Sequence, residues 1–495
     1  MPTLEPTKYL KSKKNTHYCF AGYPSVKIYQ EPTGTKWVQH LLFGDYITIL
    51  NLEVVNGRVN VLSRNKKGWA NIAELQTERV LEVNFIDIGQ GDGCHVVTPN
   101  DKHFLIDAGE YDNMNRYLNW RFNLYNKKGT QIPITAIVSH SDKDHYGGFD
   151  SIFSNCHIKI ETLYHNGVVE RPGESHPFGH VTNGYITSVV ENHAQMIDII
   201  SNPNKRKGKG SLYPKTLYKS LKYSPQVIFS MLSNKCKFLG NYNTNYKINN
   251  KPFTIEVLSP LLEEISGKPA LKTINNTGKD KNGHSIVLII KYGEAKILLG
   301  GDINEEFGKT LCTHYNATPH KLQVDVAKAC HHGSQHFHYP LLQRINALAT
   351  VISSGDDESF AHPRPDALGS FGKCGYGDKP LLFSTELARS NKEITRKKLF
   401  ELNSMLTEIA SLQIKIKEQE KNNAPQEDLV KLKTRLLTLN KHVNSNLTRY
   451  GMINLRTNGT QMIIAQKLEV DAAYGKWDIH KLEYSSKTNR FELKK

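Results

Sequence analysis

The sequence predicts an α/β protein with a small all-β unit at its N-terminus and an inserted helical hairpin. Short apolar, β-rich runs that end in Gly or polar turns begin at Val83, and they suit strands buried in a sheet sandwich. Alternating strand-like runs fill residues 18–80. Two heptad stripes lie between Glu393 and Val443. At 495 residues, the chain is long enough for two or three domains.

The first unit is expected over residues 1–80. Its strand-like runs are VKIYQ, WVQHLLF, DYITILNL and RVNVLS, and Pro, Gly, Asn and charged residues separate them. Gly44-Asp45 stands between two apolar strands, and Gly68-Trp69-Ala70 closes the pattern. The pattern resembles a bacterial SH3-like domain, a binding module usually appended to an enzyme. A plain structural β-extension is the alternative.

The catalytic domain is expected over residues 81–390. Its strands read VNFIDIG, HVVT, HFLIDAG and ITAIVSH, and each delivers polar residues at its C-terminal end. Enzymes built on sheets commonly gather their chemistry there. This part of the chain is therefore where we expect the active site.

A helical hairpin is expected over residues 391–448, with the polar segment KNNAPQ between its two heptad stripes. One helix can pack on the other without a partner, or the stripe can serve a protein partner or a homodimer, as can the SH3-like unit. Residues 449–495 then return as strands, MINLRTN and TQMIIAQKLEV, that complete the catalytic domain.

Charge and cysteine usage suggest the partners and the compartment. Sixty-four Lys plus Arg against 48 Asp plus Glu leave a formal charge of +16, which favours nucleic acid and other polyanions or only keeps the protein soluble. The seven cysteines form no C-x-x-C pair. We expect no signal peptide and no membrane span, and hence a cytoplasmic protein.

A basic segment follows at residues 203–223, where cations alternate with Tyr213, Tyr218 and Tyr223. Such a segment can hold phosphates and stack bases. It can equally be a basic surface loop without function. The predicted substrate-binding cations in it are Lys205, Arg206, Lys207 and Lys209.

The run from His140 to His145 carries the strongest chemical signal. His140, Asp142, Asp144 and His145 follow the apolar strand ITAIV directly. Imidazoles and carboxylates at this density are costly at the end of a buried strand unless a cation neutralises them. The run therefore predicts a metal site.

This run is similar to the H-x-H-x-D-H signature of metallo-β-lactamase-fold hydrolases, which have an αββα sandwich, with Asp142 in place of the second His. It most resembles the branch typified by the hydrolase domain of the bacterial DNA-uptake (competence) channel. The supporting segments, in the family's order, are DIGQGD at 87–92, LIDAG at 105–109, LLGGD at 298–302, HHGS at 331–334, and SSG with HP at 353–363.

The resemblance implies two divalent metal ions, Zn²⁺ or Mn²⁺ with Mg²⁺ possible. His140 and Asp142 would hold one metal and Asp144 and His145 the other. Asp302 would bridge them, and His331 or His332 would complete the second site. Asp144 is also a predicted catalytic residue.

The other predicted site residues are less constrained. His284 stands in NGHS, where the family usually has a ligand His, and is either a ligand or a polar turn residue. Asp107 would orient a ligand His, with Asp87, Gln90 and Asp92 as further support or as a turn. His362 would protonate a leaving group or bind phosphate, and Arg364 would contact phosphate.

These observations predict a metal-dependent phosphodiesterase or nuclease that cleaves DNA or RNA with an activated water. The first alternative is a hydrolase of a small anionic substrate such as a cyclic nucleotide, a lactone or a phosphoester. The second is a non-catalytic assembly partner.

Overall fold

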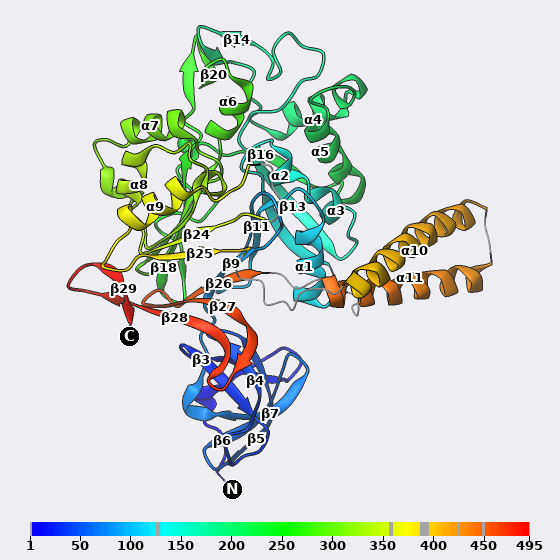
Figure 1. The fold of residues 1–495 in the computed structure, drawn as a ribbon, viewed down its shortest axis with the longest axis vertical. Helices are drawn as coiled ribbons and strands as arrows, with labels where there is room; N and C mark the ends of the chain where they lie inside the picture. The colour runs from blue at the N-terminus through cyan, green and yellow to red at the C-terminus, as the bar shows by residue number, and fades with distance from the viewer. Residues whose placement is uncertain are drawn as a thin grey trace.

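The computed structural model describes residues 2–124, 129, 131–355, 360–386, 396–422, 425–447 and 451–494. Its central part mixes helices with several sheets, so the predicted mixed α/β class is confirmed. Figure 1 shows three parts: a β-rich unit at the N-terminus in blue, a central body, and a helical hairpin in orange that projects from it. No helix among the described residues is long and apolar enough to cross a membrane.

The N-terminal unit is one strongly curved sheet. Apolar and polar residues alternate in β3 and β6, so one face of each strand is buried and the other is not. The four runs predicted from the sequence lie in β3, β4, β5 and β6, and the SH3-like assignment stays a prediction. In sheet order the strands are β1 (Leu10–Lys11), β2 (His17–Ala21), β5 (Tyr46–Val55), β6 (Arg58–Ser63), β7 (Lys66–Asn71), β3 (Ser25–Tyr29) and β4 (Trp37–Leu42), with β8 (Leu75–Gln76) beside β2.

A ten-stranded sheet forms one half of the central body. Its first strand in sequence, β9, is buried at every position, as expected for a strand covered on both faces. The strand β26, from the C-terminal segment, pairs with β9 antiparallel. In sheet order the strands are β16 (Ile228–Met231), β13 (Ile158–His165), β12 (Ile132–Ile137), β11 (His103–Ala108), β10 (Gly93–Val97), β9 (Leu81–Ile86), β26 (Met452–Thr457), β27 (Gln461–Ala472), β28 (Gly475–Ser485) and β29 (Arg490–Lys494).

A seven-stranded sheet forms the other half, and its strands from β22 to β25 are parallel. In order they are β17 (Lys247–Ile248), β18 (Lys251–Ser259), β21 (Val287–Tyr292), β22 (Ala295–Leu299), β23 (Val326–Lys328), β24 (Ala349–Ile352) and β25 (Leu381–Ser384). A small separate sheet holds β14 (Val181–Thr182), β15 (Tyr185–Ile186), β20 (Lys268–Lys272) and β19 (Glu263–Ile265).

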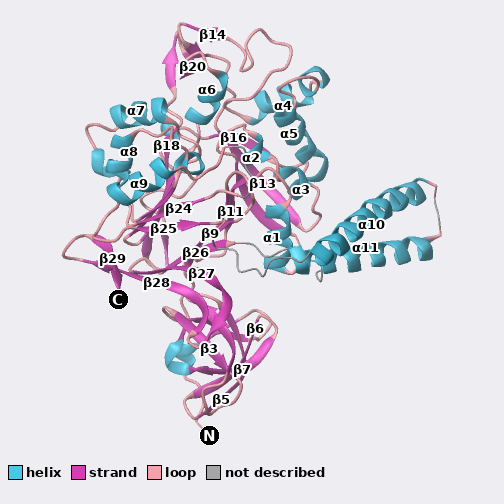
Figure 2. Ribbon diagram, viewed as in Figure 1, coloured by secondary structure: helices cyan, strands magenta, loops and turns pink. Residues whose placement is uncertain are grey.

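The two large sheets share one apolar core. Phe85 and Val96 of the first sheet belong to the same buried cluster as Ile255 and Leu288 of the second. Helices cover the outer faces (Figure 2). Over the first sheet lie α1 (Asn113–Phe122), α3 (Phe149–Phe153), α4 (His193–Ser201) and α5 (Leu212–Tyr223), and over the second lie α7 (Glu305–His314), α8 (Tyr339–Ile345) and α9 (Pro365–Cys374).

The projecting hairpin consists of α10 (Arg396–Lys421) and α11 (Gln426–Leu447). Leu402 and Ile409 of α10 are buried in one cluster with Leu439 and Val443 of α11. The heptad stripes therefore pack on each other within the chain, which is the partner-free alternative raised by the sequence. A partner or a second copy on the outer faces of the hairpin stays a prediction.

The N-terminal unit contacts the central body through the β27–β28 hairpin. The indole Nε1 of Trp477 donates to the carbonyl oxygen of His40 at 3.0 Å, and the backbone N–H of Lys476 donates to Nδ1 of His40 at 3.1 Å. Trp477 also packs in a buried cluster with Phe43 and Val80. Packing and hydrogen bonds together fix the unit on this edge of the sheet.

Candidate metal centre

The predicted site residues come together where strands of both large sheets end. Asp107 lies near the end of β11, and His140 and Asp142 follow β12. Asp144 and His145 lie on the short helix α2 (Lys143–Tyr146). Asp302 follows β22, and His331 and His332 follow β23. Parallel neighbouring strands place their carboxyl ends at one edge, so segments far apart in sequence meet here.

Two imidazole nitrogens lie close to one carboxylate oxygen, Oδ2 of Asp302, and a second carboxylate lies beside one of them. It lies 3.1 Å from Nε2 of His332 and 3.3 Å from Nε2 of His145. Nε2 of His332 lies 3.4 Å from Oδ2 of Asp144. Donors about 2.0–2.2 Å from a tetrahedral ion stand about 3.3–3.6 Å from one another, which is close to these spacings. The arrangement fits one divalent metal ion held by His145, Asp302 and His332, with Asp144 beside His332 as a further carboxylate.

Burial makes this donor set costly without a cation. His145, His332 and Asp302 are almost fully buried. Burial lowers the pKa of both histidines, but the neighbouring carboxylates outweigh it, Asp302 first, and hold both pKa values well above the ordinary range. The metal-free site therefore retains protons that a bound ion would displace.

Asp107 orients His145. Its Oδ2 accepts hydrogen bonds from Nδ1 of His145 at 2.8 Å and from the hydroxyl of Ser139 at 2.6 Å, and its Oδ1 accepts one from the backbone N–H of Ser139 at 2.7 Å. This bond holds the Nδ1 proton, so Nε2 is the nitrogen that faces the donor group and that an ion would bind on displacing its proton. This is the contact that the predicted supporting role of Asp107 requires.

Asp92 is closer to the centre than the supporting role assigned to it from sequence. It belongs with His145, Asp302 and His332 to a group whose ligand-type atoms all lie within 4.8 Å of one another. Its Oδ1 is 3.1 Å from Nδ1 of His332, and its Oδ2 contacts Nζ of Lys328. Nδ1 of His332 is hydrogen-bonded to the carbonyl oxygen of Ser353 at 3.2 Å, so that carbonyl orients the ring, and Oδ1 of Asp92 is a further candidate ligand.

Lys328 was missed by the sequence analysis. It ends β23 and is 5% exposed, and its ammonium donates to the carbonyl oxygen of Gly301 at 3.1 Å. Burial lowers its pKa, but Asp92 and Asp302 outweigh this and raise the pKa above its ordinary value. The available signal was a Lys at the end of an apolar strand, four residues before His332.

The Gly-rich segment 87–92 packs against α2. A Cβ at Gly91 would meet the carbonyl oxygen of Asp144 at 1.8 Å, and the φ of Gly91 is +103°. Only glycine fits this close approach. The backbone N–H of Asp92 donates to the same carbonyl at 3.2 Å, and Asp87 accepts from the backbone N–H of Gly89. The segment thus fixes Asp144, and Gln90 lies half-buried in it.

His140 and Asp142, the predicted ligands of the other metal, lie beside a lysine ammonium. Nε2 of His140 lies 3.6 Å from Oδ2 of Asp142. Lys281, on α6 (Thr277–Gly283), places its ammonium on Oδ1 of Asp142 and 3.5 Å from Oε1 of Glu170. Burial raises the pKa of Asp142, but His140 and Lys281 outweigh it and lower the pKa to about 2.

His284, predicted as either a ligand or a polar turn residue, makes its contacts away from the donor group. Its Nε2 donates to the carbonyl oxygen of Lys272 at 2.7 Å, and its ring packs edge-on against Phe307. Ser285 faces the site instead. Its Oγ is 3.2 Å from Nδ1 of His140 and accepts from the backbone N–H of Asp302 at 2.9 Å. Ser285 was not predicted from the sequence, because the neighbouring His284 is the more usual metal ligand.

His331 and His362 lie at the rim of the centre. Nε2 of His331 is 3.9 Å from Oδ2 of Asp302, farther than His332. The His362 ring centre is 5.8 Å from that of His331 and 6.2 Å from that of His332. Burial, then the charges of His332 and His331, lower the pKa of His362 to about 4. The backbone N–H of Arg364 donates to the carbonyl oxygen of Gly333 at 2.8 Å, which places the start of α9 here.

The predicted substrate-binding cations lie outside the donor group. Lys205 pairs with Glu174 at 2.6 Å, and Arg206 stacks on Tyr218. Lys207 and Lys209 are exposed. Tyr213 is 1% exposed inside the α5 core, so it is not available to stack a base, which corrects that part of the prediction.

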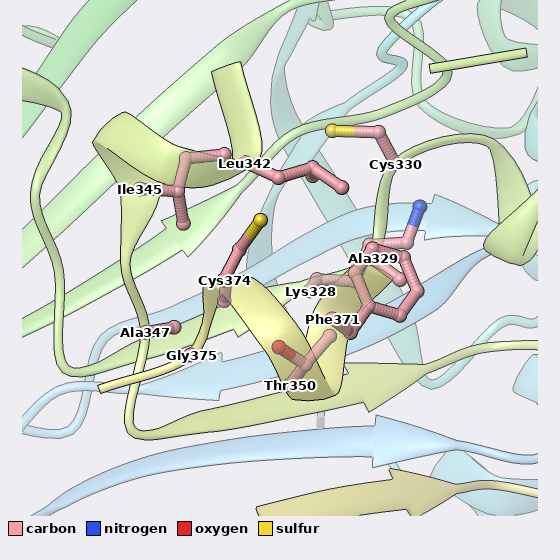
Figure 3. A pocket seen from close by; sticks show the side chains of 11 residues that line it. Lys328, Ala329, Cys330, Leu342, Ile345, Ala347, Thr350, Phe371, Cys374 and Gly375 are labelled. Atoms are coloured by element: carbon pink, nitrogen blue, oxygen red, sulfur yellow. The ribbon is translucent and has the colours of Figure 1, made fainter. Parts of the chain in front are cut away.

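A small cavity of about 20 Å³ lies behind the segment that carries His331 and His332 (Figure 3). The thiols of Cys330 and Cys374 line it with Leu342 and Phe371. Burial raises the pKa of Cys330 to about 11. A protonated thiol is a poor metal ligand and a poor nucleophile, so the site chemistry rests on imidazoles and carboxylates.

Comparisons with known proteins give little beyond this geometry. No protein-family model matches the chain, and no curated protein matches it. A crystal structure of Zn²⁺-bound PqqB from Methylobacterium extorquens is similar over 60% of this chain and 85% of that one, with 10% sequence identity and a TM-score of 0.30. The functional argument therefore rests on the site itself.

Proposed function

We propose that this chain is a metal-dependent hydrolase of the metallo-β-lactamase fold that cleaves phosphodiester bonds in DNA or RNA. The convergence of His145 and His332 on Oδ2 of Asp302, with Asp144 beside His332, carries the proposal. The motifs that resemble the family also lie, in the family's order, at strand ends of two facing sheets. This support is independent of the comparison with PqqB.

The donor group would hold the ion, and the residues around it would set its chemistry. A bound divalent ion lowers the pKa of a bound water and polarises a phosphoryl oxygen. Asp107 and the carbonyl oxygen of Ser353 hold the two imidazoles in the orientation that leaves Nε2 for the ion. His362 is neutral at pH 7 because of its lowered pKa, so it suits acceptance or relay of a proton at the rim.

Charge supports an anionic substrate. The chain carries a formal +16, and Lys281 adds an ammonium beside His140 and Asp142 at the site. The exposed Lys207 and Lys209 belong to a segment that approaches the site. The next residue, Gly210, lies beside Glu170, since a Cβ placed on it would be 3.7 Å from that side chain. Glu170 is the carboxylate that Lys281 contacts. Polyanion binding through such cations would weaken with salt. A small anionic substrate is the second candidate, since Lys281 would serve it equally.

The test is hydrolysis by purified full-length protein of single- and double-stranded DNA and RNA, and of bis(p-nitrophenyl) phosphate, with Mn²⁺, Zn²⁺ or Mg²⁺. We expect polynucleotide cleavage that is lost with EDTA and in Asp144→Asn. The matched control is Asp150→Asn, since Asp150 is an exposed carboxylate on nearby α3 that pairs with Lys219.

Each other outcome selects an alternative. Hydrolysis of the small ester without cleavage of any polynucleotide would favour the small-substrate hydrolase. Protein that binds no divalent metal and cleaves nothing would leave the assembly partner, with the SH3-like unit or the helical hairpin as the contact surface.

A further inference from the structure

We propose that the centre binds one divalent metal ion rather than two, and that the ammonium of Lys281 takes the place of the second ion as a fixed cation for the substrate's anionic group. The inference rests on the proposed metal-dependent function and makes it more specific. It replaces the two-metal arrangement that the family resemblance implies.

In the described part of the chain, a second ion would have His140 and Asp142 as its own donors and Asp302 only as a ligand shared with the first ion. His140 and Asp142 are 3.6 Å apart and could share an ion if both were free. The third donor expected from the family is missing at this point, because His284 points to the carbonyl oxygen of Lys272. The hydroxyl of Ser285 faces Nδ1 of His140 in its place, and a neutral hydroxyl is a weak ligand for these ions.

Both oxygens of Asp142 are already engaged. The ammonium of Lys281 contacts Oδ1. With the amide of Asn282 oriented so that its nitrogen faces the carboxylate, Asn282 donates to Oδ2 at 2.7 Å. An ion at Asp142 would have to displace both donors, and it would then lie beside the positive charge of Lys281. Like charges this close are costly where water is largely excluded.

Lys281 is held in place from a second side. Oε1 of Glu170 lies 3.5 Å from its ammonium, and Glu170 is largely buried. The side chain of Lys281 is still partly accessible, since it is 21% exposed beside the 29% exposed side chain of Asp142. A pre-positioned ammonium with this exposure can contact a phosphoryl oxygen without leaving its carboxylates.

The other donor group has none of these deficits. Asp144, His145, Asp302 and His332 supply two imidazoles and two carboxylates, and Asp107 and the carbonyl oxygen of Ser353 orient the imidazoles. Among the described residues, Lys328 is the nearby ammonium; it contacts Asp92 and lies 3.9 Å from Oδ1 of Asp302, whereas the imidazoles face Oδ2. One ion fits here without displacing any cation.

The first experiment counts metal ions in the full-length protein. The protein is stripped with chelator, loaded with Mn²⁺ or Zn²⁺, dialysed and analysed by mass spectrometry and by calorimetric titration. We expect one equivalent per chain. Asp142→Asn should keep that equivalent with an affinity within about threefold, whereas His145→Ala and Asp302→Asn should lose at least tenfold. Circular dichroism shows whether each variant is folded.

The second experiment tests Lys281 with inorganic phosphate as the probe. Phosphate affinity of the metal-loaded protein should fall at least tenfold in Lys281→Met. The matched control is Lys279→Met, since Lys279 is an exposed lysine on the same helix that pairs with Glu306. It should change phosphate affinity by less than twofold.

The outcomes separate this inference from the proposed function. Two tight equivalents per chain, or loss of the single equivalent in Asp142→Asn, would overturn the one-metal arrangement and leave a metal-dependent hydrolase standing. Unchanged phosphate affinity in Lys281→Met would overturn the role of the ammonium. Absence of any metal binding would instead refute the proposed function.

Discussion

Asp107 accepts a hydrogen bond from Nδ1 of His145 at 2.8 Å, and this contact decides which nitrogen of the ring faces the donor group. Because Asp107 also accepts two hydrogen bonds from Ser139, its carboxylate cannot rotate away. The imidazole is therefore fixed before any ion binds. Loss of such a supporting contact commonly lowers metal affinity by about 10–100-fold.

We predict that Asp107→Asn lowers metal affinity by about 10–100-fold, because the amide nitrogen can no longer accept the bonds that hold His145. The measurement is competition for Zn²⁺ or Mn²⁺ against a chelator of known affinity. Asp112→Asn is the control, since Asp112 is a half-exposed carboxylate at the start of α1 that pairs with Arg116. Equal affinities in the two variants would contradict the orienting role.

We predict that metal affinity rises with pH, and that it continues to rise above pH 6.5, the ordinary pKa of histidine. The pKa values of His145 and His332 are raised in the metal-free site, chiefly by Asp302 against the opposing effect of burial. Both rings therefore stay protonated beyond the ordinary histidine range, and an ion must displace those protons. The measurement is calorimetry at pH 7 in buffers of different ionisation enthalpy. Binding without proton release would show that the rings are already neutral.

The sequence predicted the site where its signal is local. The run from His140 to His145 follows an apolar strand directly, and Asp302, His331 and His332 each follow a strand end as well. The strand-like runs of the N-terminal unit and the two heptad stripes were also visible, since burial on one face imposes a period on the sequence.

The site residues that could not be predicted from the sequence are those whose roles depend on contacts between distant parts of the chain. Lys328 and Lys281 look like ordinary lysines until the fold brings them to Asp92 and Asp142, over 100 residues away in sequence. Ser285 and His284 are neighbours, and only the backbone direction after α6 decides which one faces His140. The basic segment was visible as charge, but the pairing of Lys205 with Glu174 was not.

We predict that Lys328→Met destabilises the metal-free protein by about 3–5 kcal/mol. The substitution leaves the buried Asp92 without its cation, and an unpaired buried carboxylate is costly. The comparison is Lys219→Met, whose partner Asp150 is exposed and whose ion pair should contribute about 0–1 kcal/mol. The measurement is urea unfolding in EDTA. A loss for Lys328→Met no larger than that for Lys219→Met would mean that water reaches Asp92.

Trp477 provides the last prediction, because it joins the N-terminal unit to the central body. Its indole is buried against Phe43 and Val80 and donates to the carbonyl oxygen of His40, so Trp477→Ala removes packing and a hydrogen bond together. Large-to-small changes of this kind cost about 3–5 kcal/mol. The loss falls on the contact between the two parts, so we expect faster proteolysis near residues 77–80, while metal affinity stays unchanged because the donor group lies on other strands. Tyr474→Ala is the matched control, since Tyr474 is a 67% exposed aromatic in the same hairpin. If Trp477→Ala changed metal affinity as much as proteolysis, the N-terminal unit would have to be coupled to the metal centre.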